Sequence, residues 1–138
     1  MKKLLFVLIP IIVVGVFVGY RMWNKPHANM SDQESAFTVN SADLLKEFET
    51  DEAQCNLKYV DKVIQLRGKV LSTEKADSTT IVVLDANNPK ATVRCEMDPY
   101  SNHSKTNFSK GEEVTFKGIC SGYLMGDVGI SRCVQVNK

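Results

Sequence analysis

The 138-residue chain carries 17 Lys and Arg residues against 16 Asp and Glu residues, which gives a formal net charge of +1. Four of the basic residues fall within the first 25 positions, so the rest of the chain has 13 basic residues against 16 acidic ones, a net charge of −3. A negative domain opposes the counterion release that drives binding to phosphate backbones, so charge argues against a general nucleic-acid binder. The basic residues of the first segment are Lys2, Lys3, Arg21 and Lys25.

Residues 4–20 form an uncharged, mainly apolar run between these two basic pairs. Its 17 residues reach the lower limit for spanning a bilayer and exceed the usual apolar core of a signal peptide. Tyr20 and Trp23 suit the headgroup zone, where Arg21 can also extend its charge, and no Ala-x-Ala cleavage pattern follows. We therefore predict that residues 1–25 are a retained, single-pass anchor in the cytoplasmic membrane. A cleaved signal and a buried core helix are the alternatives.

The basic residues on the two sides of the run nearly balance, so the positive-inside rule alone does not fix the orientation. A first helix this close to the amino terminus usually leaves its short end in the cytoplasm. We therefore predict that the C-terminal domain lies outside the cytoplasm, in the periplasm or cell envelope. Gly15 and Gly19 match the small-xxx-small pattern of paired membrane helices and predict a helix dimer, although glycine is common in such helices.

After the anchor, residues 26–40 are polar and predict a tether, and residues 41–138 predict the folded domain. Asn40 or Ser41 can cap a helix whose apolar stripe is Leu44, Leu45 and Phe48. A second helical segment is expected from Thr50 to about Tyr59, with Cys55 buried on it.

From Lys62 onward the apolar period changes from helical to alternating, which predicts β-strands. Three strands, an irregular insertion at 98–110 and two further strands follow one another, which is the order of a five-stranded Greek-key OB-fold barrel. The predicted fold class is therefore mainly β, with this barrel preceded by an α-helix and an N-terminal transmembrane helix. An SH3-like barrel and an open sandwich are the alternatives. The strands are expected at about 62–70, 79–85, 91–97, 114–120 and 128–136.

Two stretches of the sequence resemble a known family. Residues 56–62 followed by 68–70 fit "K-Y-x-x-K, then G-x-V", and residues 118–123 followed by 127–128 and Cys133 fit a closing hairpin. In both respects residues 41–136 are similar to the tRNA-anti-like OB-fold family, although Gly129 stands where a larger aliphatic residue is usual. The resemblance implies an OB-fold in a small membrane-anchored bacterial protein and implies no particular activity.

The sequence contains no recognisable catalytic or metal-binding motif. His27 and His103 have no motif around them, and no nucleophile elbow or glycine-rich phosphate loop occurs. The cysteines are too far apart for the close ligand pairs of zinc sites. We therefore predict a protein that is not an enzyme and has no cofactor or metal.

The face that OB-folds use for single-stranded nucleic acids lies mainly on their second and third strands, with a basic groove and aromatic platforms. Here the outward residues of those strands include one arginine, one glutamate and no aromatic residue, which argues against nucleic-acid binding. These residues are Thr79, Ile81, Val83, Thr92, Arg94 and Glu96.

We therefore predict a non-enzymatic binding module in the cell envelope, with a protein, a peptide or a glycan as its ligand. Two alternatives remain: a cytoplasmic module that binds tRNA or another single strand, and a scaffold subunit of a membrane complex. The predicted ligand-binding residues are the aromatic and basic side chains nearest the expected rim of the barrel, Arg94, Tyr100, Tyr123 and Arg132.

The hairpin near the C-terminus raises the question of a disulfide. If Gly126-Asp127 is a two-residue type II′ turn, Cys120 lies opposite Cys133 at a distance that a disulfide tolerates. In that register, however, Cys133 shares its face with polar side chains. A one-residue bulge would restore an apolar face and separate the two sulfurs, so two unbonded core cysteines are the alternative.

Overall fold

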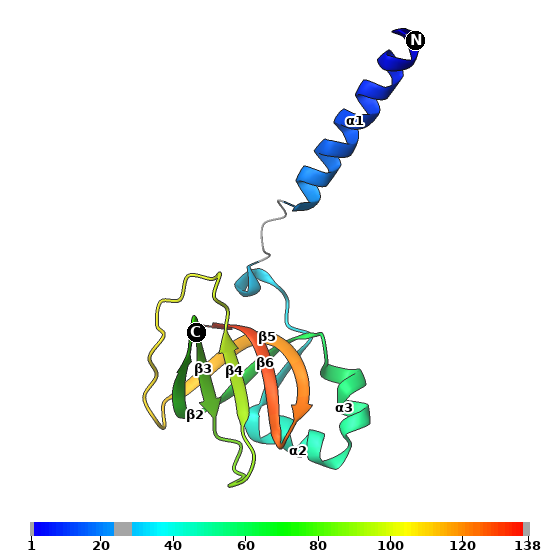
Figure 1. Ribbon diagram of the computed structural model, residues 1–138. Helices are drawn as coiled ribbons and strands as arrows, with labels where there is room; N and C mark the ends of the chain where they lie inside the picture. Colours follow the sequence, from blue (N-terminus) through cyan, green and yellow to red (C-terminus); the bar gives the residue numbers. More distant parts are fainter. Residues whose placement is uncertain (1, 24–28, 137–138) are drawn as a thin grey trace.

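A closed barrel forms the centre of the folded domain in the computed structural model, which describes residues 2–23 and 29–136 (Figure 1). In these residues six strands form one sheet in the order β1-β2-β3-β4-β6-β5, and β5 also pairs with β2. The return of β5 to β2 closes β2–β6 into a barrel, and β4 and β6 run parallel, as the Greek-key path of an OB-fold requires. The predicted OB-like fold is confirmed. The elements are α1 (Lys2–Trp23), a 3₁₀ turn (Met30–Asp32), β1 (Phe37–Asn40), α2 (Ser41–Thr50), α3 (Glu52–Tyr59), β2 (Val63–Ala76), β3 (Thr79–Leu84), β4 (Val93–Met97), β5 (Glu113–Leu124) and β6 (Asp127–Gln135).

Strand β2 is long enough to take part in both halves of the barrel. Its first part pairs with β5 through Lys69, and its second part pairs with β3 from Val70 onward. The change of partner occurs beside Gly68, where a Cβ atom would lie 2.6 Å from Ser41 Oγ. Gly68 therefore lets the start of α2 approach the strand closely, and Ser41 donates a hydrogen bond to the Asp85 carbonyl there.

Helices α2 and α3, which follow β1, pack against the barrel and cover part of its hydrophobic core (Figure 1). The predicted stripe of Leu44, Leu45 and Phe48 is buried, as is Tyr59 at the end of α3. Along β4 the side chains alternate as the sequence predicts, with Val93, Cys95 and Met97 buried. The core is therefore a single cluster shared by the barrel and its two helices.

The predicted boundary between tether and domain needs correction. Met30 is fully buried, and β1 pairs in parallel with β2 through Phe37–Asn40. The folded domain therefore begins by Met30 rather than at residue 41, and only residues before it remain for the predicted tether, 26–40. The strand is four residues long and its partner is not adjacent in sequence, so the local sequence pattern did not predict it.

The register of the last hairpin also differs from the prediction. Leu124 pairs with Asp127, so the turn residues are Met125 and Gly126, and both have positive φ (56° and 97°). This is the type I′ pattern instead of the expected type II′ turn at Gly126-Asp127. One irregularity, between Gly122 and Cys120, separates the turn from Cys120 and places it opposite Ile130, and a second follows between Ile119 and Lys117. The predicted opposition of Cys120 and Cys133 is therefore wrong, because the turn lies one residue earlier than expected and the strand pair is bulged. Both cysteines are buried free thiols.

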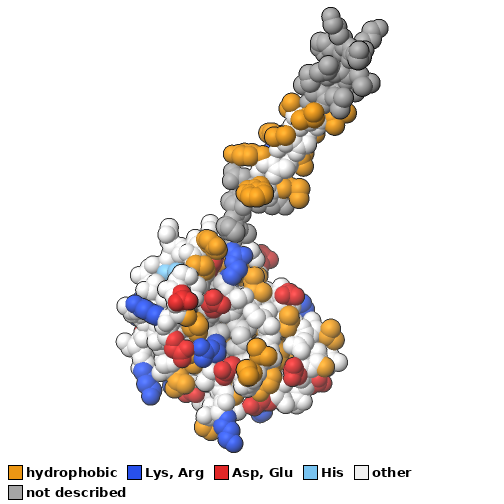
Figure 2. Space-filling view, in the orientation of Figure 1, with side chains coloured by type: hydrophobic (Ala, Val, Ile, Leu, Met, Phe, Trp, Pro, Cys, Tyr) orange, Lys and Arg blue, Asp and Glu red, His pale blue; other side chains and the backbone are white. Residues whose placement is uncertain are grey.

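Helix α1 contains the predicted helical run, residues 4–20. The apolar side chains from Ile11 to Trp23 on this helix are exposed, and Figure 2 shows them along its surface. A Cβ atom added at Gly15 or Gly19 would meet no atom within 4 Å. Among the residues that the structure describes, no helix is both long enough and apolar enough to count as a membrane span.

Candidate binding groove

The four residues predicted to bind a ligand do not form one site. Arg94 on β4 pairs with Glu74 across the outer face of the barrel, at 2.7 Å between Nη2 and Oε2. Tyr123 on β5 instead stacks on Phe48 of α2, with ring centroids 6.1 Å apart and planes at 15°. These two side chains therefore stabilise the fold at separate places.

Tyr100 and Arg132 do meet, around the buried carboxylate of Asp98. The Tyr100 N–H donates to Asp98 Oδ1 at 3.2 Å, and Arg132 Nη2 lies 3.6 Å from Oδ2. Burial alone would raise the pKa of Asp98, but hydrogen bonds from Ser101 and Tyr100 and the charge of Arg132 together lower it. Because the carboxylate accepts hydrogen bonds from within the loop and forms an ion pair with Arg132 on β6, its arrangement anchors the insertion 98–110 to the barrel. The insertion itself forms neither a helix nor a strand.

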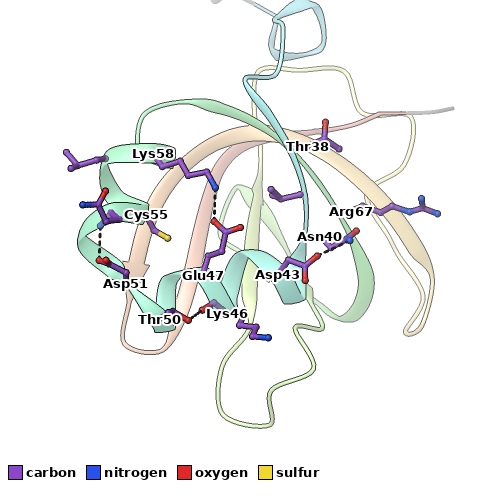
Figure 3. Close-up of a pocket in the computed structure, with 13 residues that line it drawn as sticks. Thr38, Asn40, Asp43, Lys46, Glu47, Thr50, Asp51, Cys55, Lys58 and Arg67 are labelled. Carbon is purple, nitrogen blue, oxygen red and sulfur yellow. Dashed lines mark hydrogen bonds and ion pairs between the residues drawn. The ribbon is translucent and has the colours of Figure 1, made fainter.

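A concave surface lies elsewhere, between β1 and the helix pair α2–α3. It is an open groove of about 1110 Å³ (Figure 3). In the close-up, α2 and α3 frame the groove on one side of β1, and Thr38, Asn40 and Arg67 lie along the strands. The lining residues are Thr38, Val39, Asn40, Asp43, Lys46, Glu47, Thr50, Asp51, Gln54, Cys55, Leu57, Lys58 and Arg67.

A hydrogen-bonded triad joins the two helices at the groove. Glu47 on α2 accepts from Lys58 Nζ at 2.9 Å and from the Tyr59 hydroxyl at 2.8 Å, both on α3. These two donors lower the pKa of the Glu47 carboxyl. Lys58 Nζ also lies 5.7 Å from the centroid of the Phe37 ring on β1. The triad therefore fixes the helix wall of the groove relative to the strand.

The charges around the groove are balanced. Its lining includes the acidic residues Asp43, Glu47 and Asp51 and the basic residues Lys46, Lys58 and Arg67. Two of the basic side chains already pair with acidic ones: Lys58 with Glu47, and Arg67 with Glu113 at 3.2 Å. A polyanion would therefore find no uniformly positive surface here.

The groove offers binding groups rather than reactive ones. Cys55 is its only thiol among the lining residues, and burial raises the pKa of that thiol, which disfavours the nucleophilic thiolate. No group of three or more His, Cys, Asp or Glu side chains that could hold a metal ion occurs within the described residues. What the groove presents is backbone, amides, hydroxyls and charged side chains, some of which form ion pairs.

Sequence reasoning did not find this groove. Its helix residues fell in the two predicted helical segments, Arg67 fell in the predicted strand 62–70, and Thr38, Val39 and Asn40 lay in the predicted tether. The one usable signal was Leu57, an apolar residue outside the helical stripe, which is 75% exposed on α3.

Comparison with known proteins agrees with the fold. A family model named tRNA_anti-like matches residues 1–134. A crystal structure described as a candidate nucleic acid-binding lipoprotein from Klebsiella pneumoniae is 15% identical, with 72% of this chain and 92% of that chain covered and a TM-score of 0.55. A candidate aspartyl-tRNA synthetase from Leishmania major is 12% identical over 89% of this chain and 26% of that chain, with a TM-score of 0.46. No curated protein matches the sequence.

Proposed function

This chain belongs to the tRNA_anti-like family, and we propose that it is a non-enzymatic, membrane-anchored binding module. Its ligand is a protein, a peptide or a glycan of the cell envelope, and its ligand surface is the groove between β1 and α2–α3. The observation that carries the proposal is the groove itself, which combines a concave shape with hydrogen-bonding groups and balanced charge. The usual nucleic-acid face of an OB-fold offers much less here, because strands β3 and β4 contain no aromatic residue.

Helix α1 holds the module at the cytoplasmic membrane, with the C-terminal domain outside the cytoplasm. The uncharged run at 4–20 supports this assignment, as do the exposed apolar side chains of α1, since a large exposed apolar surface marks an interaction with a membrane or a protein. Pairing of two α1 helices through Gly15 and Gly19 belongs to the same proposal.

Two experiments test the anchor and its orientation. The full chain should stay in the membrane fraction after carbonate extraction, whereas the double variant Ile12→Asp, Val16→Asp should be released or degraded. A reporter that is active only outside the cytoplasm, fused after Lys138, should be active. An inactive but stable fusion would reverse the orientation, and wild-type protein in the carbonate supernatant would contradict the anchor.

The groove is tested by site-specific photo-crosslinking in intact cells. Leu57 on α3 and Leu124 at the end of β5 are both 75% exposed, but only Leu57 lines the groove. A benzophenone amino acid at position 57 should give a discrete adduct, and the same amino acid at position 124 should not. Equal adducts at both positions, or none at position 57, would contradict the groove as the ligand surface.

The nucleic-acid alternative is tested with single-stranded RNA. A gel shift at micromolar protein that weakens steeply with salt would favour nucleic-acid binding over the proposal, because contacts to phosphates release counterions. The four rim residues Arg94, Tyr100, Tyr123 and Arg132 remain a separate prediction. If their alanine variants leave crosslinking at position 57 unchanged, the rim has no part in binding. A scaffold without a ligand surface would show no adduct from the domain at all.

A further inference from the structure

The groove has one wall that is chemically unlike the others, the outer side of strand β1. This strand ends the strand order and pairs only with β2 in the described sheet. Its other side faces the groove, since Thr38, Val39 and Asn40 all contribute to the lining. An edge strand presents a row of backbone N–H and C=O groups without strand partners.

The hydrogen bonds around β1 identify which groups are free. The Ala36 N–H donates to the Val63 carbonyl of β2 at 2.8 Å. Backbone groups alternate in direction along a strand. The backbone N–H and C=O groups of Thr38 and Asn40 therefore also point toward β2, and those of Phe37 and Val39 point toward the groove. Among the described residues, no side chain and no loop or cap backbone group forms a hydrogen bond with the backbone of Phe37 or Val39.

We propose that the groove binds an extended polypeptide segment of a partner protein, which adds as a further strand to the outer edge of β1. The inference rests on the proposed binding function and names the ligand class within it. Main-chain pairing of this kind supplies affinity, and pockets beside the edge select the ligand's side chains. Four residues of β1 span about 13 Å, so the paired part of the ligand is about four residues long.

The charges of the groove favour this ligand over a polyanion. Three acidic and three basic side chains line it, so an extended peptide of mixed or no charge meets no net repulsion. Lys46 is the lining cation without an ion-pair partner among the described residues, and it can take one carboxylate of the ligand. Leu57, exposed at the other wall, offers an apolar contact for a ligand side chain that points toward α3.

The test uses peptides whose backbone can be altered. Phage-displayed random dodecapeptides are selected against the full chain in detergent micelles, and synthetic copies are measured by fluorescence anisotropy. Methylation of the peptide nitrogen at the pairing positions should weaken binding about fivefold or more for each bond removed, the factor that corresponds to about 1 kcal/mol. Methylation at the alternate positions should leave affinity within twofold, a difference that side-chain recognition alone would not produce.

The matched protein variants are Val39→Pro and Val39→Ala. Both remove the valine side chain, but only proline removes the N–H that faces the groove, and proline is tolerated at strand edges. Val39→Pro should weaken peptide binding about fivefold relative to Val39→Ala. Thermal unfolding of both variants checks that they fold. Should Val39→Pro not fold, hydrogen exchange decides: peptide binding should slow exchange at the Phe37 and Val39 amides and leave that at Asp77, in the β2–β3 turn, unchanged.

Three results would overturn the proposal: no selected peptide that binds, affinity indifferent to both backbone changes, or unchanged exchange at Phe37 and Val39. These outcomes are distinct from failure of the proposed function. If position 57 still crosslinks a partner in cells, the groove binds a ligand by another mode. If position 57 gives no adduct either, the binding function itself fails.

Discussion

Gly118 lies on β5 and Gly129 on β6 of the same hairpin, yet a substitution by alanine should have opposite effects on stability at the two positions. A Cβ atom at Gly118 would lie 2.8 Å from the Ser131 carbonyl oxygen, 2.8 Å from Ile130 Cγ2 and 2.9 Å from Cys133 Sγ. A Cβ atom at Gly129 would have its nearest neighbour at 3.6 Å, the Ser121 Cβ atom. An added methyl group therefore clashes with its neighbours at position 118, and there is room for one at position 129.

The magnitude follows from which atoms must move. Overpacking a core costs about 1–3 kcal/mol, and the upper part of that range applies to Gly118→Ala because one of the obstructing atoms is backbone. Gly129→Ala should lie between no change and a gain of about 1 kcal/mol, because it restricts the unfolded chain without a clash. With a urea dependence of about 1.5 kcal/mol per molar, a cost of 2 kcal/mol lowers the unfolding midpoint by about 1.3 M.

The buried cysteines provide the assay. Cys95, Cys120 and Cys133 are fully buried, and burial raises the pKa of Cys120 to about 11, so alkylation at neutral pH reports the unfolded state. Labelling of the full chain is followed against urea under reducing conditions. The reasoning is refuted if the midpoints of Gly118→Ala and Gly129→Ala agree within about 0.3 M, equivalent to about 0.5 kcal/mol.

Three other substitutions test the domain boundary, the loop anchor and the triad by the same labelling. Met30→Ala should lower the free energy of unfolding by about 2–5 kcal/mol because the side chain is fully buried. A loss below about 1 kcal/mol would mean that Met30 belongs to the tether and not to the folded domain. Because folding lowers the pKa of the Asp98 carboxyl, this group stabilises the fold above its pKa in the unfolded chain, and the stabilisation is lost as the pH falls through its pKa in the folded protein. Asp98→Asn should therefore make the free energy of unfolding depend less steeply on pH on the acid side. An unchanged slope contradicts this. Tyr59→Phe removes the hydroxyl that donates to Glu47 and should cost about 1 kcal/mol, whereas no change would mean that the bond does not hold α3.

The parts of the fold that were predictable are those whose partners impose a regular pattern. Along β4 one face meets the core at every second residue, and in α2 the stripe of Leu44, Leu45 and Phe48 meets it at helical spacing. Each pattern records burial on one side only, so it appears directly in the order of residues. The order of the strands then identified the OB-like barrel.

The hairpin register was not predictable in the same way, because bulges interrupt the alternation. The turn at Met125 and Gly126 needs two residues with positive φ, and methionine gives no sign of that conformation. Beyond the turn, Arg132 also has positive φ (53°), where the strand leaves regular pairing with its neighbours. The second departure lies where β6 pairs with β4, a strand that is distant in sequence.

The proposed site escaped prediction for a reason connected with its function. A strand inside the barrel has neighbours on both sides, so its sequence carries the requirements of two partners. Strand β1 has one neighbour, β2, and its four residues alternate between half-buried and exposed side chains without a strong apolar signal. The same missing neighbour leaves the backbone groups of Phe37 and Val39 available. An edge that serves a partner is therefore expected to be the element that its own chain specifies least, and the partner's sequence carries the rest of the pattern.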